Sequence, residues 1–153
     1  MSWRLADEAL LPMRYADYAR AVLEYISATE THAGTKEPLR LDAARAAAGR
    51  WEAAARAFEK HVAAGEVHGD LRAVNAKLMA VERALTEPAG LRDRPFFKHL
   101  LVAPQPTYRS EYLPRIWEAI DRGDRGAIAA HEAELVQAFD AAAGLLRDAA
   151  AMP

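Results

Sequence analysis

Apolar residues recur every three or four positions in four separate stretches of the chain, which is the spacing of one face of an α-helix. The first stretch follows Pro12, runs through Tyr15, Tyr18 and Val22, and ends before Gly34. Alanine, the best helix former, occupies many positions between the larger residues. The pattern predicts an all-α protein built around four long helices.

Residues that favour helix ends mark the second and third helices. The second begins beside Asp42, a good N-cap or first-turn residue, and ends at Gly65. The third follows Asp70 as its N-cap and is stopped by Pro88 and Gly90. Both helices are therefore bounded by local signals at each end.

The last helix follows Asp124 and runs nearly to the C-terminus. A short extra helix over residues 113–122 precedes it, with Pro114 in its first turn. The predicted fold is an antiparallel four-helix bundle with a long irregular connection and a short extra helix before the last helix.

Residues 82–120 interrupt the helical pattern with a segment that is long and rich in aromatic residues. Structureless connections beyond about 12–15 residues are usually functional or disordered. The segment contains Phe96, Phe97, Tyr108 and Tyr112 beside several aliphatic residues, too much apolar surface for a solvated linker. We therefore expect it to pack against the bundle or a partner, and we look for function there first.

Length, charge and cysteine content narrow the class of protein. The 153 residues fit a single domain, and the formal net charge of −2 argues against nucleic acid or an anionic membrane as the main partner. The chain has no cysteine, so its redox compartment is left open. It contains no apolar run near the length of a membrane span, and Asp7 and Glu8 stand where a signal peptide would be basic and then apolar. We expect no direct membrane insertion.

The five histidines form no HExxH pair and no pair four residues apart on one helix. His61 and His68 flank the Gly65 helix end, and Glu66 between them makes a surface metal site the alternative interpretation. Solvated helix-end histidines are the favoured one. His99 follows two phenylalanines. Burial with a hydrogen bond to the backbone is the favoured interpretation there, with catalysis the alternative.

The adjacent Glu82 and Arg83 suggest ion pairs tying the third helix to the following segment, in preference to an acid–base device. No glycine-rich phosphate loop is present, and the serines have no nucleophile-elbow context. We expect no catalytic residue, no metal site and no cofactor in this chain, so that it is not an enzyme by itself.

Three pieces of the sequence stand in a characteristic order and spacing. The first joins Glu82-Arg83-Ala84, Gly90-Leu91 and Asp93-Arg94-Pro95-Phe96-Phe97-Lys98-His99; the second is Val102-Ala103-Pro104 leading to Tyr108; the third is Leu113-Pro114-Arg115-Ile116-Trp117-Glu118-Ala119-Ile120. Together they resemble the C-terminal dimerisation domain shared by the transferrin receptor and the membrane glutamate carboxypeptidases. The N-terminal residues from Trp3 to Ala19 also look like the family's crossing from peptidase domain to helical domain. The resemblance covers essentially the whole chain.

The resemblance implies that residues 1–153 are a single dimerisation domain, with residues 1–14 as the boundary segment, at the C-terminal end of a longer peptidase. It implies a homodimer and contact with a peptidase domain whose active site the helical domain covers. Zinc is implied for that peptidase domain alone. A periplasmic or extracellular location is likewise implied by resemblance only, and the sequence leaves the compartment unknown.

The resemblance also implies a substrate contact. In the carboxypeptidases a Lys-Tyr pair in this segment reaches the pocket for the C-terminal glutamate, and Tyr108 matches the Tyr. Thr107 stands where the Lys would be, which argues against glutamate as the substrate, and Arg109 is an alternative source of positive charge. The other interpretation is that Tyr108 only packs the loop.

The leading functional hypothesis is therefore a non-catalytic dimerisation and active-site lid domain of a glutamate carboxypeptidase-like zinc exopeptidase. The alternative is a free-standing helical module for protein interaction, without peptidase activity. A third hypothesis, with less support, is a small helical enzyme that uses His99 and Tyr108 directly.

Overall fold

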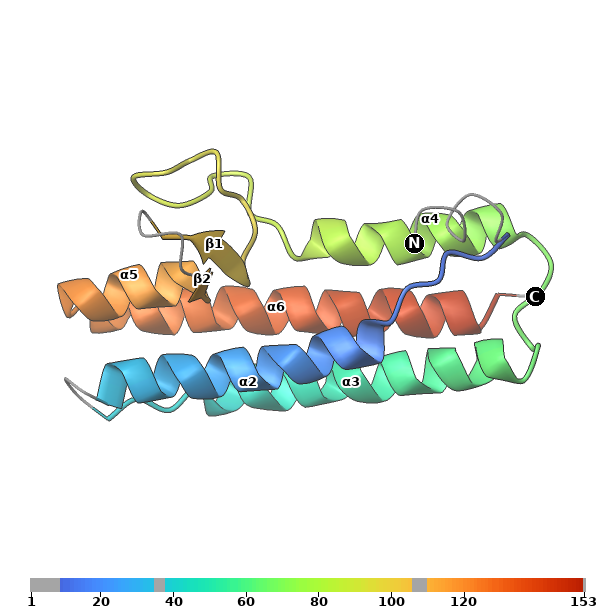
Figure 1. Cartoon of the computed structure of the whole chain (residues 1–153), viewed down its shortest axis with the longest axis horizontal. Coiled ribbons are helices and arrows are strands. Elements are labelled where there is room, and N and C mark those ends of the chain that lie inside the picture. Colours follow the sequence, from blue (N-terminus) through green and yellow to red (C-terminus); the bar gives the residue numbers. More distant parts are fainter. Residues whose placement is uncertain (1–8, 35–37, 106–109, 153) are drawn as a thin grey trace.

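The computed structural model describes residues 9–34, 38–105 and 110–152. Within these ranges it contains five helices and two short strands: α2 (Tyr15–Gly34), α3 (Asp42–Ala63), α4 (Leu71–Ala84), β1 (Val102–Pro104), β2 (Ser110–Tyr112), α5 (Pro114–Arg122) and α6 (Arg125–Ala150) (Figure 1). The predicted four long helices and short extra helix are confirmed. The two strands are additional, because three-residue strands are too short to show a period of two in the sequence.

The long helices run alternately in opposite directions, α2 and α4 one way and α3 and α6 the other (Figure 1). α3 packs against both α2 and α6, and α4 packs on α6. The short α5 lies against α6 and also contacts α2. This arrangement is the predicted helical bundle, with α3 and α6 as its central pair.

Small side chains line the contact between α3 and α6, so that the two helices approach closely. Trp51 on α3 is fully buried at the middle of this contact; its ring centroid lies 5.7 Å from that of Phe139 on α6 and 5.4 Å from that of Tyr18 on α2. The other buried residues of the two helices are Ala44, Ala47, Ala48, Ala54, Ala55 and Phe58 on α3, and Leu135, Ala138, Ala142, Ala143, Leu146 and Ala149 on α6. One large ring thus joins three helices where alanine supplies little apolar area.

The helix ends follow local signals with one exception. Asp70 and Asp124 are the N-caps of α4 and α6, and their carboxylates accept backbone N–H groups of the first turn. Asp42 lies in the first turn of α3 and its capping position is Leu41, whose side chain cannot accept a hydrogen bond. Glu132 on α6 accepts two of the first N–H groups of α3 instead, at 3.1 and 3.2 Å.

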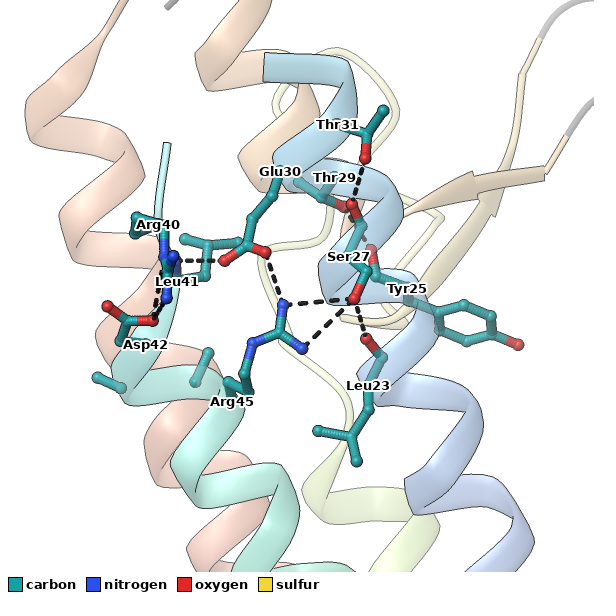
Figure 2. Close-up of polar contacts among 12 residues, drawn as sticks. Leu23, Tyr25, Ser27, Thr29, Glu30, Thr31, Arg40, Leu41, Asp42 and Arg45 are labelled. Atoms are coloured by element: carbon teal, nitrogen blue, oxygen red, sulfur yellow. Dashed lines mark hydrogen bonds and ion pairs between the residues drawn. The ribbon is translucent and has the colours of Figure 1, made fainter. Parts of the chain in front are cut away.

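Figure 2 shows how Glu30, near the end of α2, reaches the start of α3. One carboxylate oxygen accepts the Leu41 N–H at 2.9 Å, and the other accepts from the Arg45 guanidinium at 2.6 Å. Arg45 also donates to the Ser27 hydroxyl, one turn earlier on α2, at 3.3 Å. Glu30 therefore satisfies the backbone at the start of α3 and fixes α3 to α2.

Replacing Glu30 with alanine should lower the free energy of unfolding by about 1 to 3 kcal/mol, because a backbone N–H and a guanidinium lose their shared acceptor. Urea unfolding followed by circular dichroism measures the change. The matched control is Glu24→Ala on the exposed side of the same helix, which should stay within about 0.5 kcal/mol. Equal losses in the two variants would contradict this role.

Candidate functional site

The connection between α4 and α5 (residues 85–113, described over 85–105 and 110–113) contributes buried leucines to the core. It is anchored near both ends by backbone hydrogen bonds, from Leu100 N–H to the Leu85 carbonyl and from Leu113 N–H to the Leu101 carbonyl, each 2.9 Å. Its leucines are buried: Leu85, Leu91, Leu100, Leu101 and Leu113. The connection is therefore held on the bundle by apolar contacts as well as by its backbone.

Within the connection, β1 and β2 pair as an antiparallel hairpin with Val102 opposite Tyr112 and Pro104 opposite Ser110. The Tyr112 ring stacks on that of Tyr25 of α2 with centroids 4.3 Å apart. The Thr29 hydroxyl of α2 donates to the Tyr112 carbonyl at 3.4 Å. These contacts hold the β2 side of the hairpin against α2.

Arg94 joins the two strands of this hairpin to α5. Its guanidinium donates to the Pro104 carbonyl at 2.7 Å, to Glu111 Oε2 at 2.8 Å and to Glu118 Oε1 at 3.1 Å. Glu111 is only 6% exposed, so its carboxylate depends on this cation for compensation. The hydrogen bonds to Glu111 and then Glu118 raise the pKa of Arg94 against the opposing effect of burial. We call Arg94, Glu111 and Glu118 the Arg94 clamp.

A tight turn places Arg94 in this position. Gly90 has a φ of 66°, and a Cβ added to it would lie 2.3 Å from the Pro95 carbonyl oxygen, so only glycine fits. The Leu91 N–H donates to the Phe97 carbonyl and the Phe97 N–H donates to the Arg94 carbonyl, at 3.0 and 2.9 Å. Pro95 therefore sits at a point where the chain folds closely back on itself.

Phe96 corrects the expectation that the aromatic residues of this segment are packed. Its side chain is 71% exposed, while the Arg94 guanidinium lies 5.7 Å from the centroid of the neighbouring Phe97 ring. The leucines of the connection supply the buried surface, and the turn directs Phe96 outward. Phe96 is thus an exposed aromatic group on a firmly held loop.

His99 lies where the connection meets α2. Its Nδ1 accepts the Leu101 N–H at 3.1 Å, and its Nε2 lies 3.2 Å from the Tyr18 hydroxyl. Burial lowers the pKa of His99 from its ordinary value of 6.5. Both ring nitrogens are thus engaged in holding the connection.

The ion pairs expected for Glu82 and Arg83 do not occur among the described residues. Glu82 is half-buried near Tyr15 and Tyr18, and burial raises the pKa of its carboxyl. Arg83 is exposed and contributes its backbone carbonyl, which accepts from the Thr86 hydroxyl at 2.7 Å. The helix register directs these two neighbours to different sides of α4.

The remaining site predictions divide between the described and undescribed parts of the chain. Pro104 ends β1 and Pro114 begins α5 as a buried first residue. Thr107, Tyr108 and Arg109 lie outside the described residues, between the strand ends at Pro104 and Ser110. The boundary segment is described from residue 9 onward.

The described residues contain no group of three or more His, Asp or Glu side chains that could hold a metal ion. The resemblance implies zinc for a peptidase domain alone, and we assign it no role in these residues. None of the helices in the described ranges has the length and apolar character needed to cross a bilayer.

Glu111 and Glu118 are the site residues that sequence reasoning missed. They lie 17 and 24 residues beyond Arg94 and share no local spacing with it. The available signal was chemical, since an acidic residue needs a cation when it is buried.

Fold and site together define a small helical domain with a short β-hairpin that Arg94 holds in place. Its described part contains no metal-binding cluster. The family model described as "Transferrin receptor-like dimerisation domain" matches residues 39–147. The chain belongs to this family, which confirms the resemblance seen in the sequence.

Similar proteins are peptidases by name. The probable glutamate carboxypeptidase LAMP1 of Arabidopsis thaliana is 33% identical over 126 residues, which are 80% of this chain and 18% of that protein. The aminopeptidase NAALADL1 of Rattus norvegicus is 27% identical over 108 residues, 66% of this chain and 14% of that protein. The probable glutamate carboxypeptidase VP8 of Zea mays is 42% identical over 53 residues, 33% of this chain and 7% of that protein. This chain thus spans less than a fifth of each relative.

The Arg94 clamp can be tested with a double-mutant cycle. Arg94→Gln and Glu111→Gln should each lower the free energy of unfolding by about 2 to 4 kcal/mol, since the Arg94→Gln change leaves Glu111 buried without its cation. The double variant should lose less than the sum, with a coupling of about 1 to 3 kcal/mol. Chemical unfolding of the four proteins measures it.

The matched control is the exposed pair of Arg50 on α3 and Asp140 on α6, whose closest atoms are 2.8 Å apart. The cycle of Arg50→Gln and Asp140→Asn should give a coupling below about 1 kcal/mol, because water competes for both groups. A coupling at the Arg94 clamp no larger than this control would contradict its role.

Proposed function

We propose that this chain acts as the self-association domain of a glutamate carboxypeptidase-like peptidase and forms a homodimer. The observation that carries the proposal is the dimerisation-domain match over residues 39–147. The peptidase names of its relatives, each far longer than the matched part, support a parent enzyme with a separate catalytic domain. The exposed Phe96 and Met79, 71% and 45% exposed, are apolar groups available to a partner.

We further propose that the hairpin serves as a lid over the active site of that catalytic domain. The Arg94 clamp supports this role, because Arg94 holds both Pro104 and Glu111, which lie on either side of residues 105–109 in the chain. The strand ends that flank these residues therefore have defined positions on the domain. Tyr108 is the residue we propose to contact substrate, with Arg109 as a second candidate and zinc chemistry supplied by the other domain.

The isolated chain should sediment as a dimer at concentrations on the order of 50 µM, with an interface above about 1,000 Å². Its unfolding midpoint should rise with protein concentration, since dissociation accompanies unfolding of a dimer. Analytical ultracentrifugation and thermal unfolding at several concentrations measure the two effects. A monomer with a concentration-independent midpoint would contradict self-association.

In the enzyme that joins this domain to its peptidase domain, Tyr108→Phe should lower kcat/KM for the peptide substrate by roughly 10-fold to 100-fold. The reason is the loss of one hydrogen bond to a charged group, worth about 1.5 to 3 kcal/mol. The control is Tyr112→Phe, whose ring stacks on Tyr25 in the bundle and which should change kcat/KM by less than about two-fold. Equal effects of the two changes would argue against substrate contact by Tyr108.

A further inference from the structure

The contacts of His99 require one protonation state. A backbone N–H can only donate, so the 3.1 Å contact from Leu101 N–H means that Nδ1 carries no proton. In the neutral ring the proton is then on Nε2, which donates to the Tyr18 hydroxyl oxygen at 3.2 Å. Both contacts exist together only in this tautomer of neutral His99.

The residues that His99 holds form the entry to the hairpin. The Leu100 N–H donates to the Leu85 carbonyl, and the Leu101 carbonyl accepts the Leu113 N–H at the start of α5. Val102 follows directly and pairs with Tyr112 as the first residue of β1. His99 also forms an antiparallel bridge with Thr86 just beyond α4. The Leu101 amide thus lies at a junction of α4, α5 and the hairpin.

The groups around the Tyr18–His99 pair keep the phenol protonated. Burial raises the pKa of Tyr18, and the charges of Glu82 on α4 and of Tyr25 and Tyr15 on α2 add to this effect. Burial likewise raises the pKa of Tyr15 to about 12. Tyr18 is therefore a neutral partner, and His99 is the group of the pair that gains charge on acidification.

The other groups next to Tyr18 and His99 do not offer either side chain a substitute for the contact between them. The ring of Tyr18 meets the uncharged indole of Trp51 on α3, at an interplanar angle of 67°. Lys98, beside His99 in the chain, is exposed, and its carbonyl accepts the Glu87 N–H at 2.8 Å. The lowered pKa of His99 has burial of its ring as its cause.

We propose that neutral His99 is a proton-sensitive latch, and that protonation of its Nδ1 releases residues 100–102 from the bundle and loosens the hairpin. The protonated ring has donors at both nitrogens, so Nδ1–H faces the Leu101 N–H and the acceptor is lost. The Leu101 side chain is fully buried, and water reaches its amide only if the segment moves. The Arg94 guanidinium remains charged throughout, so the release is local to the hairpin entry.

The direction of the pH effect follows from the lowered pKa. Between the ordinary pKa of 6.5 and the lower value in the fold, the unfolded chain binds more protons at His99 than the folded chain. The latch is therefore complete above pH 6.5, and its contribution is lost as the pH falls through the pKa of His99 in the fold. Acidification loosens the hairpin, and a return to neutral pH restores it.

The test uses the isotope-labelled chain and nuclear magnetic resonance. At about pH 7.5 the ring nitrogens of His99 should report the neutral tautomer with its proton on Nε2. Below the His99 midpoint, hydrogen-exchange protection of the Leu101 amide should fall by up to about ten-fold per pH unit, because the fraction of neutral ring falls by that factor. Protection at Trp51 and Phe139, in the central helices, should not follow.

The matched variant is His99→Asn, whose side-chain oxygen takes the place of Nδ1 as an acceptor and does not titrate. In this variant, hydrogen-exchange protection of the Leu101 amide should not change over the pH range in which His99 titrates in the unaltered chain. The control is His68→Asn at an exposed position, which should behave like the unaltered chain. If His99→Asn does not fold, the titration of the unaltered chain decides alone. Three results would each overturn the proposal. They are a protonated Nδ1 of His99 at neutral pH, protection of the Leu101 amide that does not change with pH, and a loss of amide protection that Trp51 and Phe139 share equally.

Discussion

The packing of α3 against α6 is the contact on which the other parts of the domain depend. Alanine lets the two helices approach closely, and the buried ring of Trp51 fills the space between Phe139 on α6 and Tyr18 on α2. α2 is thereby held on one side of the central pair, while α4 packs on α6. Because the seam offers little apolar area per turn, polar contacts such as Glu30 with Arg45 complete the attachment of neighbouring helices.

Two polar side chains of different kinds, Arg94 and His99, hold the connection between α4 and α5 on this helical bundle. Arg94 binds the buried carboxylate of Glu111 and the Pro104 carbonyl, and a guanidinium keeps its charge at any physiological pH. His99 binds through a neutral ring that becomes charged when it is protonated on acidification. The hairpin is therefore held by two contacts. The contact of Arg94 with Pro104 and Glu111 is permanent, and the contact of His99 with Leu101 at the hairpin entry responds to protonation.

This division would suit the positioning role that we propose for the hairpin. The family match places the chain among transferrin receptor-like dimerisation domains, and its relatives bear peptidase names. A hairpin fixed by the Arg94 clamp keeps a constant orientation relative to α5, while its entry can yield without unfolding the bundle. The two roles are compatible because they use separate residues: the Arg94 clamp holds the hairpin in place, and His99 controls its entry.

The sequence by itself determined the helices, most of their ends and the family, since these depend on neighbours three or four residues apart and on motifs. Asp70, Asp124 and Pro114 mark their helix ends as local chemistry requires. Only the tertiary structure decided that β1 and β2 pair, that Phe96 is exposed, and that Arg94 meets Glu111 while His99 meets Tyr18, 81 residues away. Such pairs arise where packing brings distant segments together, so no local pattern encodes them.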